Sequence, residues 1–323
     1  MTASTDFAGR AVPDSAAISR RFRRQDRLFF LLTLGSATLV VALLLAILVV
    51  LAIEAWPTFS TFGLSFLWGT TWSAPRDIYG ALPAVLGTLI SSLIAMLIAV
   101  PLSVGIAVFL TELCPARLRR PLGTAIELLA GVPSIIYGIV GLFVLVPLMQ
   151  STILPVLMAT VGQLPLIGRL FQAPAPGIGL LTASFVLSVM ILPFITAITR
   201  DVFNTVPVML RESAYGMGMT TWEVVRHIII PYTRLGMVGG IMLGLGRALG
   251  ETMAVTFVVG SVTRLQTSII SPSTTISAQI ANSFGDADGL QLSSLIALGL
   301  ILFVLSFCVL ALAKWLIGRT DSF

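Results

Sequence analysis

Two ionisable side chains, Arg247 and Glu251, lie within a long apolar stretch of the sequence. If residues 236–261 form a membrane-spanning helix, Arg247 lies about 16 Å from its start, close to the middle of a hydrocarbon core about 30 Å thick. A charge there costs at least about 2.5–3.5 kcal/mol and usually marks a transport pathway or a paired site. Glu251 follows one turn later on the same face, so a structural ion pair is the alternative. Arg before Glu is the less favourable order for such a pair, which favours substrate passage.

The chemistry of arginine indicates what would pass. Its guanidinium is always charged, and its planar fork of donors suits phosphate or carboxylate oxygens. The same charge repels cations. We therefore expect an anion path at Arg247, although this argument does not select the anion.

Residues 200–235 form a second region with a distinctive pattern. A short helix is expected over residues 211–217, and Gly218 can end it in the left-handed conformation. Thr220 and Glu223 then fit a capping box at the start of another helix. That helix carries an apolar face, and Pro231 is expected to stop it. The apolar residues of this face are Val224, Val225, Ile228 and Ile229. Two short helices of this kind suit a groove on a partner protein.

The composition identifies the class of protein that must position these residues. Of the 323 residues, 57% are hydrophobic and 10% are charged, against about 25% charged in a soluble globular protein. Two cysteines, Cys114 and Cys308, and one histidine, His227, exclude a disulfide scaffold and a Cys- or His-rich metal site. The single lysine, Lys314, precedes Trp315, so a phosphate-binding loop ending in Gly-Lys-Ser/Thr is impossible. ATP hydrolysis, if it drives this protein, belongs to another polypeptide.

We predict an all-α polytopic membrane protein with six spans, because a spanning helix needs about 20 apolar residues. The spans are expected at about 28–53, 84–110, 125–149, 177–199, 236–261 and 290–317. Residues 1–27 and 318–323 are then cytoplasmic ends, and 28–317 is the transmembrane domain. The first span is too long for the apolar core of a signal peptide and is expected to be retained.

Charge distribution gives the orientation. Six spans place most of the 19 basic residues on the side of both termini, which is therefore cytoplasmic. A seventh span at 150–176 would move the Arg-rich segment 200–235 outside, against the positive-inside rule. We expect 150–176 to be an outer loop, with or without a short interfacial helix.

Two further patterns are interpreted structurally. Thr124 and Glu127 fit a capping box at the start of the third span. The spacings Gly240-x3-Gly244 and Gly246-x3-Gly250 are typical of close helix packing.

The segment 200–235 resembles the EAA motif of binding-protein-dependent ABC importer permeases, E-A-A-x3-G-x9-I-x-L-P. The match starts at Glu212 and ends at Pro231, with Ser213 and Ile230 as the two mild departures. In that family this loop is the coupling helix that docks on the ATP-hydrolysing subunit. The residues to which the resemblance assigns this role are Glu212, Ala214, Gly218, Glu223, Ile228 and Pro231.

Most of the chain, from about residue 25 onward, resembles the PstC-type phosphate permeases. Residues 246–255 (GRALGETMAV) are similar to the fifth-span signature of that family, 131–138 (GVPSIIYG) to its third-span motif, and 79–83 (YGALP) to its second-span entrance. Tyr79 stands where Phe is usual. The resemblance implies a type I ABC importer permease fold and a substrate path that includes Arg247, Glu251, Thr252 and Ser134.

The resemblance also implies an assembly in a bacterial inner membrane. Its members are a PstA-type sister permease, two copies of a PstB-type ATPase that uses Mg-ATP, and a PstS-type extracytoplasmic phosphate-binding protein. This chain would contact membrane lipid, bind no cofactor, metal or nucleic acid, and catalyse no reaction itself.

Two other functions remain open from the sequence. A permease for another oxyanion, such as molybdate or sulfate, would share the coupling loop and the six spans. A secondary transporter or channel would need no ATPase, and the motif at 212–231 argues against it.

Overall fold

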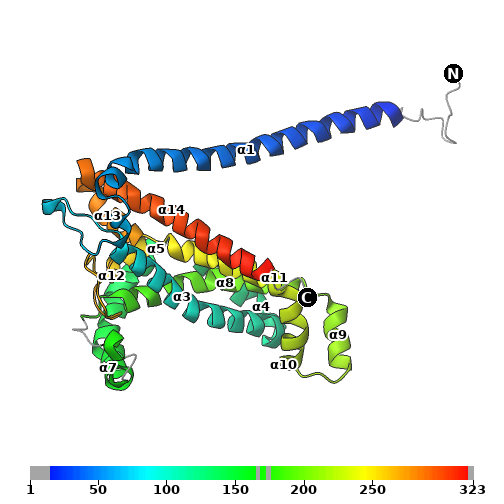
Figure 1. The fold of residues 1–323 in the computed structure, drawn as a ribbon. Coiled ribbons are helices and arrows are strands. Elements are labelled where there is room, and N and C mark those ends of the chain that lie inside the picture. The colour runs from blue at the N-terminus through cyan, green and yellow to red at the C-terminus, as the bar shows by residue number, and fades with distance from the viewer. Residues whose placement is uncertain (1–14, 165–167, 172–175, 319–323) are drawn as a thin grey trace, which may run out of the picture. The chain divides into compact units, whose positions relative to one another are not determined.

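The computed structural model describes residues 15–164, 168–171 and 176–318 (Figure 1). The expectations for residues 1–14, 165–167, 172–175 and 319–323 lie outside the described residues. The chain divides into two units, residues 1–53 and 54–323, and each is treated by itself.

The described part of the first unit is one helix. Helix α1, Ser15–Phe62, starts here and continues into the second unit. Its residues 25–62 are long and apolar enough to cross a membrane.

The second unit is built around helix α8, Leu180–Asn204, which packs against α3, Leu82–Val108, and α11, Ile230–Leu249 (Figure 1). Gly240 and Gly244, four residues apart on α11, make close packing with α8 possible. A Cβ on Gly240 would lie 2.8 Å from Ile198, and one on Gly244 would lie 2.7 Å from Ile195. The close-packing role expected of these two glycines is confirmed.

The remaining elements complete the unit. In chain order they are α2 Ser65–Trp68, η1 Ala74–Arg76, η2 Phe109–Leu113, α4 Ala116–Ala130, α5 Ser134–Val140, η3 Gly141–Leu145, α6 Val146–Leu148, η4 Met149–Ile153, α7 Leu154–Thr160, η5 Val161–Gln163, η6 Gly168–Phe171, α9 Val208–Gly216, α10 Thr221–Val224, η7 Val225–Ile229, α12 Met253–Val259, α13 Ile276–Ser283, η8 Phe284–Asp286 and α14 Gly289–Gly318. The described residues contain no β-strand.

Within the described residues, six helical stretches are long and apolar enough to span a membrane, which agrees with the predicted number. They are Gln25–Phe62, Leu82–Leu113, Ser134–Gln163, Leu180–Asn204, Thr221–Leu249 and Gly289–Trp315. The apolar sequence therefore predicted the fold class and the span count, whereas the bounds of the third and fifth spans were wrong.

The third span starts later and ends later than predicted. Residues 116–130 form the separate helix α4, and the chain breaks at 131–133 before α5 begins. The span then continues to Gln163, so the first part of the expected outer loop is helical. The expected capping box at Thr124 and Glu127 is also wrong, because both residues lie inside α4 rather than at a helix start.

Wide π turns explain why the third and fifth spans continue through prolines. The π turns η3, η4 and η7 each end two residues before a proline, at Pro147, Pro155 and Pro231. In each case the residue before the proline donates its N–H to the carbonyl five residues back instead of four. The wider turn moves the backbone away from the proline ring, whose clash with the carbonyl four residues back otherwise breaks a helix. Pro231 therefore does not stop its helix, contrary to the sequence prediction.

At the end of the second unit away from α9, the segments that connect the spans pack against the spanning helices (Figure 1). The Ile276 N–H, at the start of α13, donates to the Thr88 hydroxyl of α3 at 2.9 Å. Tyr79 contacts the ring of Trp72, with 4.9 Å between the ring centroids. Burial raises the pKa of Tyr79 to about 12, and a hydrogen bond from its hydroxyl to Asp77 acts in the same direction.

Candidate functional site

The coupling segment, residues 200–235, starts with the last residues of α8, and the helix α9 that follows is anchored to the second span. Arg211 of α9 donates from Nη1 to Glu112 Oε1 at 2.8 Å and from Nη2 to the Phe203 carbonyl at 2.5 Å. The Glu112 side chain is 5% exposed, so the ion pair is largely shielded from solvent. The pair ties α9 to η2, at the end of the second span. This pair could not be predicted from the sequence, because no local pattern links two residues 99 positions apart.

The turn after α9 has the predicted conformation. Gly218 has a φ of 85°, in the left-handed region. Its N–H donates a hydrogen bond to the Tyr215 carbonyl at 2.9 Å, and the Met219 N–H donates one to the Ala214 carbonyl at 3.2 Å. These two bonds form a Schellman motif. A Cβ on Gly218 would meet no atom within 4 Å, so the backbone conformation alone disfavours other residues here.

The capping box that starts α10 is also confirmed. The Thr220 N–H donates to Glu223 Oε2 at 2.7 Å, and the Glu223 N–H donates to Thr220 Oγ1 at 3.4 Å. Two backbone donors that the helix cannot use are satisfied in this way.

The apolar face of the coupling segment differs from the prediction. Val224, Val225 and Ile229 do not face a partner, because they are buried in a cluster within this chain. Other apolar side chains of the segment are exposed instead. The most exposed are Met209 (78%), Met217 (75%), Trp222 (66%) and Val208 (65%). Sequence periodicity detected an apolar face but could not tell which side of the segment the chain itself covers.

The other residues of the EAA-like pattern lie at different depths. Ala214 is buried, Ile228 and Glu223 are partly exposed, and Glu212 and Pro231 are exposed. Ala214 is thus part of the support of the segment, whereas Glu212 is available to a partner.

Arg247 lies in the last turn of α11 rather than in the middle of a longer helix. Its guanidinium carbon is 5.6 Å from the centroid of the Phe194 ring on α8. A cation over an aromatic face at this distance is stabilised by about 0.5–2 kcal/mol. Arg247 also lies close enough to Tyr137 for an electrostatic interaction.

Glu251 does not continue the helix of Arg247. Helix α11 ends at Leu249, and α12 starts at Met253. In the break between them, Glu251 Oε1 accepts a hydrogen bond from the Ala254 N–H at 3.2 Å. Within the described residues neither Arg247 nor Glu251 has an ion-pair partner. The expected placement on one helical face is therefore wrong, and the alternative of a structural ion pair finds no contact to support it.

The third-span motif packs beside this break. A Cβ on Gly138 of α5 would lie 3.1 Å from the Met253 carbonyl oxygen and 2.8 Å from Phe257 of α12. The Tyr137 hydroxyl donates to the Leu129 carbonyl at 2.9 Å and so bridges the chain break at 131–133. Two interrupted helices, α4–α5 and α11–α12, thus meet through α5 and α12.

The two hydroxyl residues expected in the path lie at these breaks. Ser134 is the first residue of α5, and Thr252 directly precedes α12. The described contacts include no hydrogen bond from either residue to Arg247; the Thr252 hydroxyl donates to the Gly250 carbonyl at 3.4 Å.

The chain matches the family model described as binding-protein-dependent transport system inner membrane component over residues 100–322. It is 56% identical to the phosphate transport system permease protein PstC of Mesorhizobium japonicum over 307 residues, which are 95% of this chain and 94% of that protein. Identity to the protein of the same description from Pasteurella multocida is 54%, over 93% of this chain and 92% of the other.

Solved structures support the fold. A bacterial alginate ABC transporter in complex with an alginate-bound periplasmic protein has a chain that aligns with a TM-score of 0.61 at 17% identity, over 94% of this chain and 98% of that one. A second alginate importer structure aligns with a TM-score of 0.54 at 17% identity, over 91% and 99%. The chain therefore belongs to the binding-protein-dependent inner membrane transport components and, within them, to the PstC family of phosphate transport permeases.

Proposed function

We propose that this chain is the permease subunit of an ATP-driven importer and forms half of the translocation path for inorganic phosphate. The observation that carries the proposal is the 56% identity to a PstC permease over 95% of the chain. An inner membrane protein with six spans and an exposed coupling segment is consistent with this role.

ATP hydrolysis is assigned to a partner subunit. Helix α9 and the turn after it form the docking surface, with Glu212 exposed and Ala214 buried beneath it. Gly218 and Glu223 hold the turn, while Ile228 and Pro231 lie in the helix that continues into the fifth span. Movement of α9 is transmitted to the second span through the Arg211–Glu112 ion pair. It is transmitted to the fifth span through α10 and η7.

Phosphate passage is assigned to the breaks at 131–133 and 250–252. Interrupted helices near substrate sites are common in transporters, because their free backbone groups are available to ions. Arg247 supplies the positive charge, and Glu251 holds the start of α12 through Ala254. Ser134 and Thr252 supply hydroxyl groups beside the two breaks.

The proposed assembly contains a PstA-type sister permease, two copies of a PstB-type ATPase that binds Mg-ATP, and a PstS-type binding protein. The family description names a binding-protein-dependent system, which supports the last partner. Both termini and the coupling segment are assigned to the cytoplasm, because most of the basic residues lie on that side. The proposed domain bounds remain 1–27, 28–317 and 318–323.

Radiolabelled phosphate uptake tests the substrate. In cells lacking other phosphate importers, deleting the gene for this chain is expected to abolish uptake at low micromolar phosphate, and restoring it is expected to recover uptake. Excess unlabelled phosphate should compete, whereas sulfate and molybdate should not. Strong competition by sulfate or molybdate alone would favour the other oxyanion permeases.

A further inference from the structure

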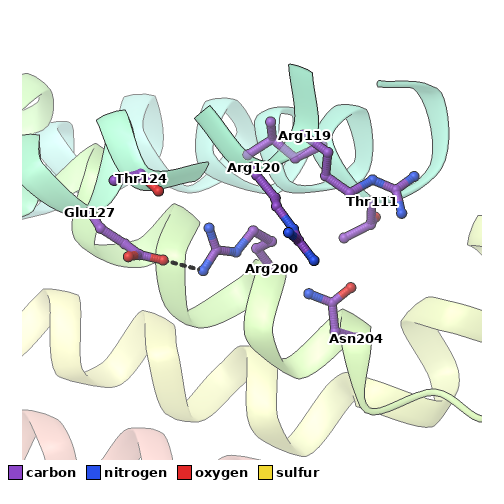
Figure 2. A pocket seen from close by; sticks show the side chains of 8 residues that line it. Thr111, Arg119, Arg120, Thr124, Glu127, Arg200 and Asn204 are labelled. Atoms are coloured by element: carbon purple, nitrogen blue, oxygen red, sulfur yellow. Dashed lines mark hydrogen bonds and ion pairs between the residues drawn. The ribbon is translucent and has the colours of Figure 1, made fainter. Parts of the chain in front are cut away.

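A basic pocket lies away from the proposed phosphate path. It has a volume of about 340 Å³ and is formed by η2, α4 and the last turns of α8. Figure 2 shows its polar lining, which includes the side chains of Arg119, Arg120 and Arg200. The pocket lies at the end of the second unit that carries the coupling segment, because η2 also holds Glu112, the partner of Arg211.

Of the three arginines that line the pocket, only Arg200 is paired with carboxylates among the described residues. Arg200 is paired with two carboxylates, Glu127 at 2.5 Å and Asp201 at 2.7 Å. Arg119 and Arg120 have no ion-pair partner among the residues that the structure describes. Because like charges repel, two unpaired guanidinium groups beside a third favour the binding of an anion between them.

The neutral polar groups of the pocket are suited to the same ligand. In Figure 2 the Arg120 side chain points toward Arg200 and Asn204, and the Arg119 side chain extends toward Thr111. Asn204 and Thr124 line the pocket, and no side-chain hydrogen bond involves either residue among the described contacts. Forked guanidinium donors with amide and hydroxyl donors nearby are the groups that bind the oxygens of a phosphate.

Helix α4 has a second, apolar face on the side opposite the pocket. Leu118, Leu122 and Leu129 follow a helical spacing and are 52%, 39% and 51% exposed. Arg120 and Thr124 lie on the pocket side of the same helix. A helix with leucines on one face and arginines on another is suited to the membrane interface. Basic pockets between membrane helices bind phospholipid head groups.

We propose that this pocket binds a phosphate-bearing anion, held by Arg119 and Arg120, with Arg200 fixed beside them by Glu127 and Asp201. The phosphate group belongs to an anionic phospholipid or to free inorganic phosphate. This site is separate from Arg247, and the proposal stands whether or not the chain transports phosphate.

Binding by the full-length chain, purified in detergent with its co-purifying subunits, tests the proposal. One arm titrates phosphatidylglycerol, with neutral phosphatidylcholine for comparison, and detects bound lipid by native mass spectrometry. The other arm measures radiolabelled inorganic phosphate by equilibrium dialysis in an Arg247→Gln background, which removes the central charge of the proposed path. The test variant is Arg119→Gln with Arg120→Gln. The control is Arg117→Gln with Arg226→Gln, which removes two exposed charges outside the pocket.

We expect the Arg119/Arg120 variant to weaken binding of one of the two probes about thirtyfold and the control to change it less than about threefold. The probe that responds identifies the source of the phosphate group. Arg120→Lys keeps the charge but loses the fork, so it should weaken binding less and leave the fold intact. Equal binding by test and control variants, equal binding of phosphatidylcholine, or no binding of either probe by the chain with its natural pocket residues would overturn the proposal.

Discussion

At the scale of single residues, the environment of Arg247 decides its role. The sequence predicted a charge within an apolar span, because that charge is visible in the local composition. It could not predict the ring of Phe194 beneath the guanidinium, because that contact comes from another span. Nor could it predict that the helix ends after Leu249, since glycine is frequent in membrane helices without breaking them.

Replacing Arg247 separates a structural role from a transport role. Arg247→Gln removes a partly exposed charge near the end of a span, which should not hinder insertion, and loses a contact with Phe194 of about 0.5–2 kcal/mol. We expect undiminished protein in the membrane and a loss of phosphate uptake. Arg247→Lys should restore uptake only in part, because it lacks the planar fork. Arg264→Gln, an exposed arginine outside the assigned spans, is the matched control. Normal uptake by Arg247→Gln would contradict the assigned role.

The Arg211–Glu112 pair makes a second prediction at this scale. Arg211→Leu leaves the shielded Glu112 carboxylate without its partner, and breaking such a pair costs about 3–5 kcal/mol. The double variant Arg211→Leu with Glu112→Leu removes both charges and should recover most of the loss. The measurement is the temperature at which half of the detergent-purified protein aggregates. Additive effects of the two substitutions would show that the pair does not anchor α9.

At the scale of elements, local signals were predicted well and long-range ones were not. The turn at Gly218 and the capping box at Thr220 depend on residues a few positions apart, so the sequence contains the whole motif. The continuation of helices through Pro155 and Pro231 depends on π turns, which have no residue signature of their own. The buried face of α10 and η7 depends on Phe203 of α8 and Ala107 of α3, which are contributed by other helices.

Gly218 gives the prediction for the coupling element. Gly218→Val places a β-branched side chain at a φ of 85°, which costs about 1–3 kcal/mol and distorts the turn after α9. We expect normal membrane insertion, weaker recovery of the ATPase in a pull-down, and reduced phosphate uptake. Gly105→Val is the control, because Gly105 lies in α3, outside the proposed docking surface, and a Cβ there would meet no atom within 4 Å. The prediction fails if Gly218→Val recovers the ATPase and transports as well as Gly105→Val.

At the scale of the whole molecule, the count of six spans could be predicted because it depends only on apolar length. The packing of α8 against α3 and α11 could not be predicted, because the apolar face of a span does not indicate which helix it contacts. The small-residue spacing on α11 was a partial exception, since Gly240 and Gly244 do face α8.

The orientation of the molecule makes a separate prediction. Single cysteines at Gln163 and Ser213, both exposed, are introduced after Cys114→Ala and Cys308→Ser. An impermeant thiol reagent should label Gln163→Cys in intact cells and Ser213→Cys only after the cells are opened. Labelling of Ser213→Cys from outside would reverse the assigned topology.

ATP-driven phosphate uptake into proteoliposomes tests the central claim most directly. The complex that contains this chain is reconstituted with ATP inside the vesicles, and radiolabelled phosphate with the binding protein is added outside. The account predicts accumulation of phosphate that requires ATP and is reduced when Gly218→Val weakens docking of the ATPase. Equal uptake with and without ATP would contradict it, because the chain would then move phosphate without the partner that its coupling segment is proposed to bind.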